Sequence, residues 1–115
     1  MISIYGIKNC DTMKKAFRWL DEHNIEYQFF DYKKVGVDSK LAKQWLAQQD
    51  WQQIINKRGT TWRKLDDETK DAMDNANALE IMQAQPSIIK RPLIIKDSEI
   101  ILGFNAEEYQ RQFLN

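Results

Sequence analysis

The chain is poor in the residues that build disulfides and zinc sites, because its 115 residues include one cysteine, Cys10, and one histidine, His23. A single thiol excludes an intrachain disulfide. One cysteine and one histidine are also too few for the cysteine- and histidine-rich ligand sets of structural zinc. The sequence therefore predicts a reducing compartment, no metal and no tightly bound cofactor. Any redox cycle has to take its second thiol from another molecule.

An excess of one charge and long apolar runs are also missing. Lys plus Arg and Asp plus Glu both number 17, so nothing favours direct nucleic-acid binding, which relies on clustered positive charge. No apolar run exceeds three residues, as at Ile100–Leu102, whereas a membrane-spanning helix needs about 20. The opening residues Met1–Tyr5 are typical of a strand and not of a secretory signal. We expect a cytoplasmic protein with no membrane association.

Glycine and proline are scarce, at four and two residues, while 43% of the chain is hydrophobic and 30% is charged. Disordered chains have fewer aromatic residues and a bias to one charge, so this composition indicates an ordinary globular protein. A chain of this length buries one proper core without disulfides. We expect a single domain over residues 1–115.

The order of the predicted elements is typical of a thioredoxin-like fold. The expected elements are a strand at 2–5, a helix from 11, a strand at 25–32, a loop at 33–37, a helix from 38, a helix at 51–55, an irregular loop at 56–65, an interrupted helix at 66–85, a hairpin of strands at 91–96 and 99–102, and a helix at 106–114. The first two strands should be parallel, because a helix joins them. The sequence therefore predicts an α/β protein whose four-stranded mixed sheet has a helical insertion, at about 38–85, between its βαβ and ββα halves.

Cys10 lies where the loop after the first strand meets the first helix, with Asp11 and Thr12 as the expected capping residues. A helix N-terminus presents unpaired N–H groups and a partial positive charge. Such a site stabilises a thiolate and lowers a cysteine pKa from ~8.5 to between ~3.5 and ~7.5. This position predicts a nucleophilic thiol. The alternative is a small residue that simply packs in the core.

Three segments, in this order along the chain, resemble the arsenate reductase (ArsC) family. They are Tyr5-Gly6-Ile7-Lys8-Asn9-Cys10-Asp11-Thr12, Arg58-Gly59-Thr60-Thr61-Trp62-Arg63-Lys64-Leu65 and Ile88-Ile89-Lys90-Arg91-Pro92-Leu93. The resemblance runs over essentially the whole chain and is greatest to the YffB-like branch, which is related to the Spx and MgsR regulators. It implies the thioredoxin fold, attack by Cys10 on an oxyanion, and resolution of the adduct by glutathione.

The resemblance also implies an anion-binding site. Arg58 and Arg91 match two of the family's three anion-holding arginines, and Asn9 and Thr12 flank the nucleophile in the same motif. Arginine suits this role because it stays charged and offers a planar fork of donors. Pro92 matches the cis-proline of the fold. Without the resemblance, both arginines would be interpreted as solvated surface residues.

The sequence departs from the family pattern at two places. The segment that should carry the third arginine, 102–105, has no basic residue, which makes arsenate a doubtful substrate. The regulators' Cys-x-x-Cys is also incomplete, because Met13 stands where the second cysteine would be. The four tryptophans, including Trp51 and Trp62, show no spacing for stacking and are interpreted as packing residues.

These observations support an oxidoreductase as the leading hypothesis. It is a glutathione-linked monothiol reductase that uses the Cys10 thiolate, with glutathione as co-substrate, glutathione or glutaredoxin as partner, and a small anionic or thiol substrate. The alternative is an Spx-like transcription regulator that binds RNA polymerase without turnover. A fold relic, in which Cys10 is only a packed thiol, is the third possibility.

Overall fold

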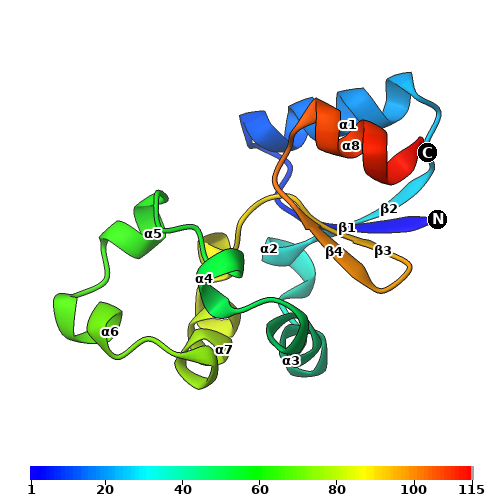
Figure 1. The fold of residues 1–115 in the computed structure, drawn as a ribbon. Helices are drawn as coiled ribbons and strands as arrows, with labels where there is room; N and C mark the ends of the chain where they lie inside the picture. The colour runs from blue at the N-terminus through cyan, green and yellow to red at the C-terminus, as the bar shows by residue number, and fades with distance from the viewer. Residues whose placement is uncertain (115) are drawn as a thin grey trace. The chain divides into compact units, whose positions relative to one another are not determined.

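The computed structural model describes residues 1–114, which form two compact units. The first, called the sheet unit, combines Met1–Asp31 with the chain from Arg91 onward. The second, called the helical unit, is Tyr32–Lys90 and is inserted into the first in sequence. The predicted single domain over 1–115 stays a prediction, and each unit is described by itself. Figure 1 shows the chain as a ribbon.

The sheet unit contains a four-stranded mixed sheet. The strands are β1 (Ile2–Gly6), β2 (Tyr27–Asp31), β3 (Leu93–Lys96) and β4 (Glu99–Leu102), in the order β2-β1-β3-β4. The β1 strand pairs in parallel with β2 and antiparallel with β3, and β3 pairs antiparallel with β4. The predicted α/β, thioredoxin-like arrangement is therefore confirmed.

Two helices of the sheet unit, α1 (Asp11–Glu22) and α8 (Ala106–Phe113), cover one face of the sheet (Figure 1). Their apolar stripes and alternate residues of the strands meet in one core. Its buried members are Ile2, Ile4, Met13, Ala16, Leu20, Ile94, Ile101 and Tyr109. The helical periodicity read from the sequence thus identified the buried side of α1 correctly, because a stripe at i, i+3 and i+7 faces one direction.

The β3–β4 hairpin turns at Asp97 and Ser98, as predicted. Both residues have positive φ, 48° and 72°. Two-residue hairpin turns with two positive φ values match the right-handed twist of the flanking strands. Asp accepts this conformation more readily than most side chains do.

The helical unit is built from short helices. They are α2 (Tyr32–Val35), α3 (Ser39–Gln48), α4 (Trp51–Ile54), α5 (Thr60–Arg63), α6 (Asp67–Asp71), α7 (Asn75–Ala84) and the 3₁₀ turn η1 (Pro86–Ile88). The α3 helix packs against α7, and Trp45, Ile54 and Met82 are among the residues buried in this unit. The predicted interruption of 66–85 is the break between α6 and α7.

Two local predictions in this unit are wrong. The irregular loop expected at 56–65 contains the short helix α5, which begins directly after Gly59. The segment 33–37 was expected to be a loop because it is polar and contains Gly36, yet its first residues are helical in α2. Tyr32, at the start of this helix, is buried to 1% exposure, and its carbonyl accepts a hydrogen bond from the Gly36 N–H at 2.8 Å. A buried first residue fixes the chain at one end, which the polar sequence of 33–37 does not show.

Candidate functional site

Cys10 itself is the N-cap of α1. Its backbone is extended, with φ −148° and ψ 130°, and its carbonyl accepts the first helical hydrogen bond from the Lys14 N–H at 3.0 Å. The expectation that Asp11 and Thr12 cap the helix is therefore wrong, since both residues are already inside it. The thiol is half-buried against the core of the sheet unit.

A close contact between Gly6 and Met13 sets the position of the first turn of α1. A Cβ built on Gly6 would lie 2.5 Å from the Met13 Sδ and 2.7 Å from its Cε. Because Met13 is fully buried, a larger residue at position 6 would force the end of this side chain to repack. Glycine at this position therefore leaves the space that Met13 fills below the first turn of α1.

The surroundings of the sulfur favour its ionised form. Partial burial raises the pKa of the Cys10 thiol, but the backbone N–H groups of Met13 and Thr12 and the charge and hydrogen bond of the Arg91 guanidinium lower it more. The net pKa is below the usual value. The side chain of Cys10 makes no capping hydrogen bond, so the N–H groups at the start of the helix remain available to a thiolate.

Arg91 and Pro92 lie directly before β3. The peptide bond between them is cis, the form that the family resemblance implied, and the Pro92 carbonyl accepts a hydrogen bond from the Gly103 N–H at 2.9 Å. Pro92 is buried, whereas Arg91 is half-buried and interacts with the sulfur of Cys10. The sheet unit thus brings a thiol, a guanidinium and a cis-proline together.

Two predicted site residues have smaller contributions in this unit. Thr12 is exposed, and its backbone N–H, rather than its hydroxyl, acts on Cys10. Asn9 is exposed in the loop before Cys10. Their roles in anion binding stay predictions, as does that of Arg58, which belongs to the helical unit.

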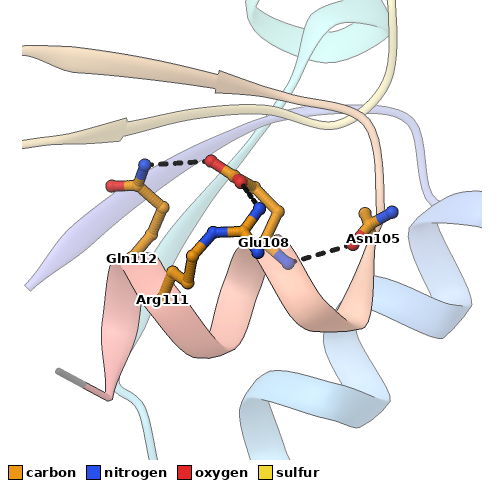
Figure 2. Close-up of polar contacts among 4 residues, drawn as sticks. All are labelled: Asn105, Glu108, Arg111 and Gln112. Carbon is orange, nitrogen blue, oxygen red and sulfur yellow. Dashed lines mark hydrogen bonds and ion pairs between the residues drawn. The ribbon is translucent and has the colours of Figure 1, made fainter.

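The segment expected to carry a third arginine has a different role, which Figure 2 shows in part. Asn105 is the N-cap of α8, and its Oδ1 accepts a hydrogen bond from the Glu108 N–H at 2.9 Å. Arg111 pairs with the Glu108 carboxylate, which also accepts a hydrogen bond from Gln112 at 3.0 Å. The nearest arginine in sequence is therefore engaged within its own helix and does not replace the missing one.

Tyr109 is a residue that sequence reasoning missed. Its ring is buried, and its hydroxyl donates a hydrogen bond to the Gly103 carbonyl at 2.6 Å. Gly103 also donates its N–H to Pro92, so Tyr109 supports the backbone beside the cis-proline. A helical period predicts that Tyr109 is buried, but it does not show which carbonyl its hydroxyl reaches.

The environment of Arg58 is ordered by a turn. The Gly59 N–H donates to the Asn56 carbonyl at 3.2 Å, and the Arg58 N–H donates to the Asn56 Oδ1 at 3.1 Å. The Arg63 guanidinium donates to the Arg58 carbonyl. Arg58 is exposed, and both its backbone N–H and its carbonyl are hydrogen-bonded to side chains of the same segment.

Two tryptophans beside this turn stack, contrary to the expectation from their spacing. The rings of Trp51 and Trp62 have centroids 5.9 Å apart and are inclined by 24°. The Lys57 ammonium lies 4.9 Å from the Trp51 centroid and 5.8 Å from that of Trp62. The turn brings together residues that are far apart in sequence, which spacing along the chain cannot show.

Some kinds of site are absent from residues 1–114. No three histidine, cysteine, aspartate or glutamate side chains in this range lie where they can hold a metal ion. Within the same residues, no helix has both the length and the apolar character needed to cross a bilayer.

The sheet order, the thiol at the start of the first helix and the arginine before a cis-proline define a thioredoxin-like protein. Within that class, the chain belongs to the ArsC family, whose model matches residues 5–112. A solved structure named YFFB has a TM-score of 0.91 and is 48% identical, covering 96% of this chain and 97% of its own.

Two further relatives span almost the same length. An arsenate reductase (ArsC) related protein from Brucella melitensis has a TM-score of 0.81 and is 46% identical, covering 97% of this chain and 93% of its own. The global transcriptional regulator Spx of Listeria innocua is 26% identical over 96% of this chain and 86% of its own. The family thus includes relatives named for reductase chemistry and relatives named for regulation.

Proposed function

We propose that this protein is a glutathione-linked thiol reductase with Cys10 as its nucleophile. The observation that carries the proposal is the set of groups around the sulfur: two backbone N–H groups and the Arg91 guanidinium favour its thiolate. A thiolate, and not a thiol, attacks disulfides. Packing of a neutral thiol in the core requires neither the two N–H groups nor the guanidinium beside the sulfur.

The reaction uses one protein thiol and two molecules of glutathione. The Cys10 thiolate attacks the glutathione sulfur of a mixed disulfide R–S–S–G, the S–S bond breaks, and RS⁻ leaves and takes a proton. The new Cys10–glutathione disulfide is attacked by a second glutathione thiolate, which releases the Cys10 thiolate and oxidised glutathione. The net exchange is R–S–S–G + GSH → RSH + GSSG: the R sulfur is reduced, and the sulfur of the one glutathione thiol consumed is oxidised into the new disulfide, whose other half arrives with the substrate.

The arginines supply recognition of the anionic partner. Arg91 lies beside the sulfur, where its charge also suits a carboxylate of glutathione. Arg58 is the second proposed anion-binding residue, on the basis of its place in the family motif, with Asn9 and Thr12 as neighbours of the nucleophile. With two arginines of three, we propose a glutathione-bearing or small thiol substrate rather than arsenate.

The setting that fits this chemistry is the cytoplasm, which holds glutathione and glutaredoxin at the reducing poise that regenerates a lone thiol. Glutaredoxin is the proposed protein partner, because it resolves mixed disulfides with glutathione. We propose no tightly bound cofactor.

A regulatory function is the second candidate, and its support is the likeness to the Listeria regulator Spx over most of the chain. In this candidate the protein binds RNA polymerase and Cys10 has no turnover. The missing second cysteine of Cys-x-x-Cys argues against an internal disulfide switch of that kind.

The test of the proposed function compares the native chain with Cys10→Ser and Arg91→Ala. The rate of alkylation of Cys10 by iodoacetamide, followed against pH, reports the thiol pKa. We expect a midpoint below the ~8.5 of a free cysteine and a higher midpoint in Arg91→Ala, because the guanidinium is one of the groups that lower the pKa.

Turnover is measured in the same proteins with a glutathione mixed disulfide, reduced glutathione, glutathione reductase and NADPH. We expect NADPH consumption above the level of Cys10→Ser. An ordinary midpoint that is indifferent to Arg91, together with no turnover, would contradict the reductase. Copurification of the untreated protein with RNA polymerase would then favour the regulator.

A further inference from the structure

Arg58 is an exposed residue in a turn, yet both of its backbone polar groups are bound by protein. Its N–H donates to the Asn56 Oδ1 at 3.1 Å, and its carbonyl accepts from the Arg63 guanidinium. In an exposed turn, water satisfies these groups without help from side chains. The two contacts therefore restrict the backbone from which the Arg58 side chain projects.

The turn is also fixed to the rest of the helical unit. The Asn56 N–H donates to the Ile88 carbonyl at 2.8 Å, and a hydroxyl pair joins Thr61 and Ser87 at 2.7 Å. A Cβ on Gly59 would lie 3.0 Å from the Asn56 Nδ2, so a side chain there would displace the Asn56 amide. These contacts tie the segment on both sides of Arg58 to the chain around η1.

The residue before Arg58 is held by a third kind of contact. The Lys57 ammonium lies within 4.9 Å of the Trp51 ring centroid and 5.8 Å of the Trp62 centroid. The face of an aromatic ring attracts a cation, so the two rings hold the ammonium in this position. Lys57 comes directly before Arg58, whereas Arg63 comes after it. The contact of Lys57 with the two rings therefore restricts the backbone on the N-terminal side of Arg58.

We propose that Arg63 and Lys57 are positioning residues for Arg58. Arg63 holds the Arg58 carbonyl, Lys57 holds the turn against the two tryptophans, and the guanidinium of Arg58 is thereby presented to an anionic partner with less conformational freedom to lose on binding. The inference rests on the proposed function, in which Arg58 binds the anion. Arg63 and Lys57 act through the backbone of Arg58 and do not touch the anion.

The first measurement uses the full chain and two probes of Cys10, at an alkaline pH where the thiol is ionised in every variant. Oxidised glutathione is the anionic probe, and iodoacetamide is the neutral one. The variants are Arg58→Ala, Arg63→Gln, Lys57→Gln and the two double variants with Arg58→Ala. Lys64→Gln is the matched control, because it removes one exposed positive charge next to Arg63.

We expect Arg58→Ala to slow the reaction with oxidised glutathione about tenfold, the value for one lost charge-assisted hydrogen bond. Arg63→Gln and Lys57→Gln should each slow it about threefold, because a displaced arginine keeps part of its interaction. Lys64→Gln and all iodoacetamide rates should change less than about twofold, since screened surface charges contribute little. In the Arg58→Ala background, the other two substitutions should have no further effect.

The second measurement follows backbone amide exchange of Arg58 and Gly59 by NMR, which does not depend on any activity. We expect faster exchange in Arg63→Gln and Lys57→Gln than in Lys64→Gln. Unchanged exchange overturns the proposal. So does an additive effect on the glutathione rate in the double variants, which would mean that Arg63 or Lys57 binds the anion directly. Faster exchange with no effect of Arg58→Ala on either probe overturns the anion-binding role of Arg58 in the proposed function instead.

Discussion

Four helices of the helical unit and the first helix of the sheet unit begin in different ways. In the helical unit, α3, α4, α6 and α7 each follow an aspartate whose carboxylate accepts a hydrogen bond from the helix; these are Asp38, Asp50, Asp66 and Asp74. In the sheet unit, α1 follows Cys10, whose side chain makes no such bond. A carboxylate cap carries its charge permanently at neutral pH, whereas a thiol acquires charge only when it ionises.

This difference separates a stabilising helix start from a reactive one. The same N–H groups that bind a carboxylate in the helical unit are left in α1 to lower the pKa of a nucleophile. In the helical unit these caps stabilise the starts of four helices. In the sheet unit the start of α1 has no side-chain cap, and there the N–H groups face the thiol.

The largest effect is expected when α1 is given a side-chain cap, which removes the difference between the two kinds of helix start. Cys10→Ser places a hydroxyl of similar size at the N-cap, and Cys10→Ala places nothing there. We expect both variants to lose all reaction with oxidised glutathione, and the serine variant to be more stable than the alanine variant by about 1 kcal/mol. Urea denaturation measures this difference. Equal stabilities would mean that the N–H groups at the start of α1 are not available to a side chain.

The reverse change removes a cap from the helical unit. Asp74 accepts a hydrogen bond from the Asn77 N–H at 2.8 Å at the start of α7, which packs against α3. We expect Asp74→Ala to lower the free energy of unfolding by about 1 kcal/mol, with no change in the pKa of Cys10. Asp71→Ala is the control, because Asp71 is exposed at the end of α6 and caps nothing. A loss as large in the control would contradict the role of the cap.

The smallest expected effect concerns a carboxylate at the start of α8. Hydrogen bonds from Gln112 and Arg111 lower the pKa of Glu108. A carboxyl whose folded pKa is depressed stabilises the fold above its unfolded pKa, ~4.3, and this contribution is lost as the pH falls through the folded value. Glu108→Gln should therefore lose less stability than the native chain when urea melts at neutral pH and below pH ~4 are compared.

The control for this measurement is Glu107→Gln. Glu107 lies beside Glu108 in the first turn of α8, and among residues 1–114 its side chain makes no hydrogen bond. The same acid dependence in Glu107→Gln and Glu108→Gln would contradict a specific contribution of the Glu108 contacts.

The sequence predicted what depends on local pattern. The stripe of Met13, Ala16 and Leu20 identified the buried face of α1, and the turn at 97–98 predicted the hairpin, because period and turn chemistry act over a few residues. The aspartate at 38 likewise marked the start of α3. The thioredoxin-like sheet followed from the order of these elements.

What sequence could not show depends on how the chain folds back at a turn and on which of several adjacent residues takes a given position. Stacking of Trp51 on Trp62 and the contact of Arg63 with the Arg58 carbonyl arise from the turn between them. The capping position of Cys10 itself was missed because Asp11 and Thr12 have stronger capping propensities than cysteine. At the start of α1 the N-cap is thus a residue of weak capping propensity, and that residue is the proposed nucleophile.

Arg91 occupies the joint between the two units of the chain. The residue before it, Lys90, donates its N–H to the Ile54 carbonyl at 2.8 Å within the helical unit, and the residue after it, Pro92, accepts from Gly103 at 2.9 Å within the sheet unit. The residue whose guanidinium acts on Cys10 is therefore held at both of its backbone neighbours, each by a hydrogen bond within a different unit.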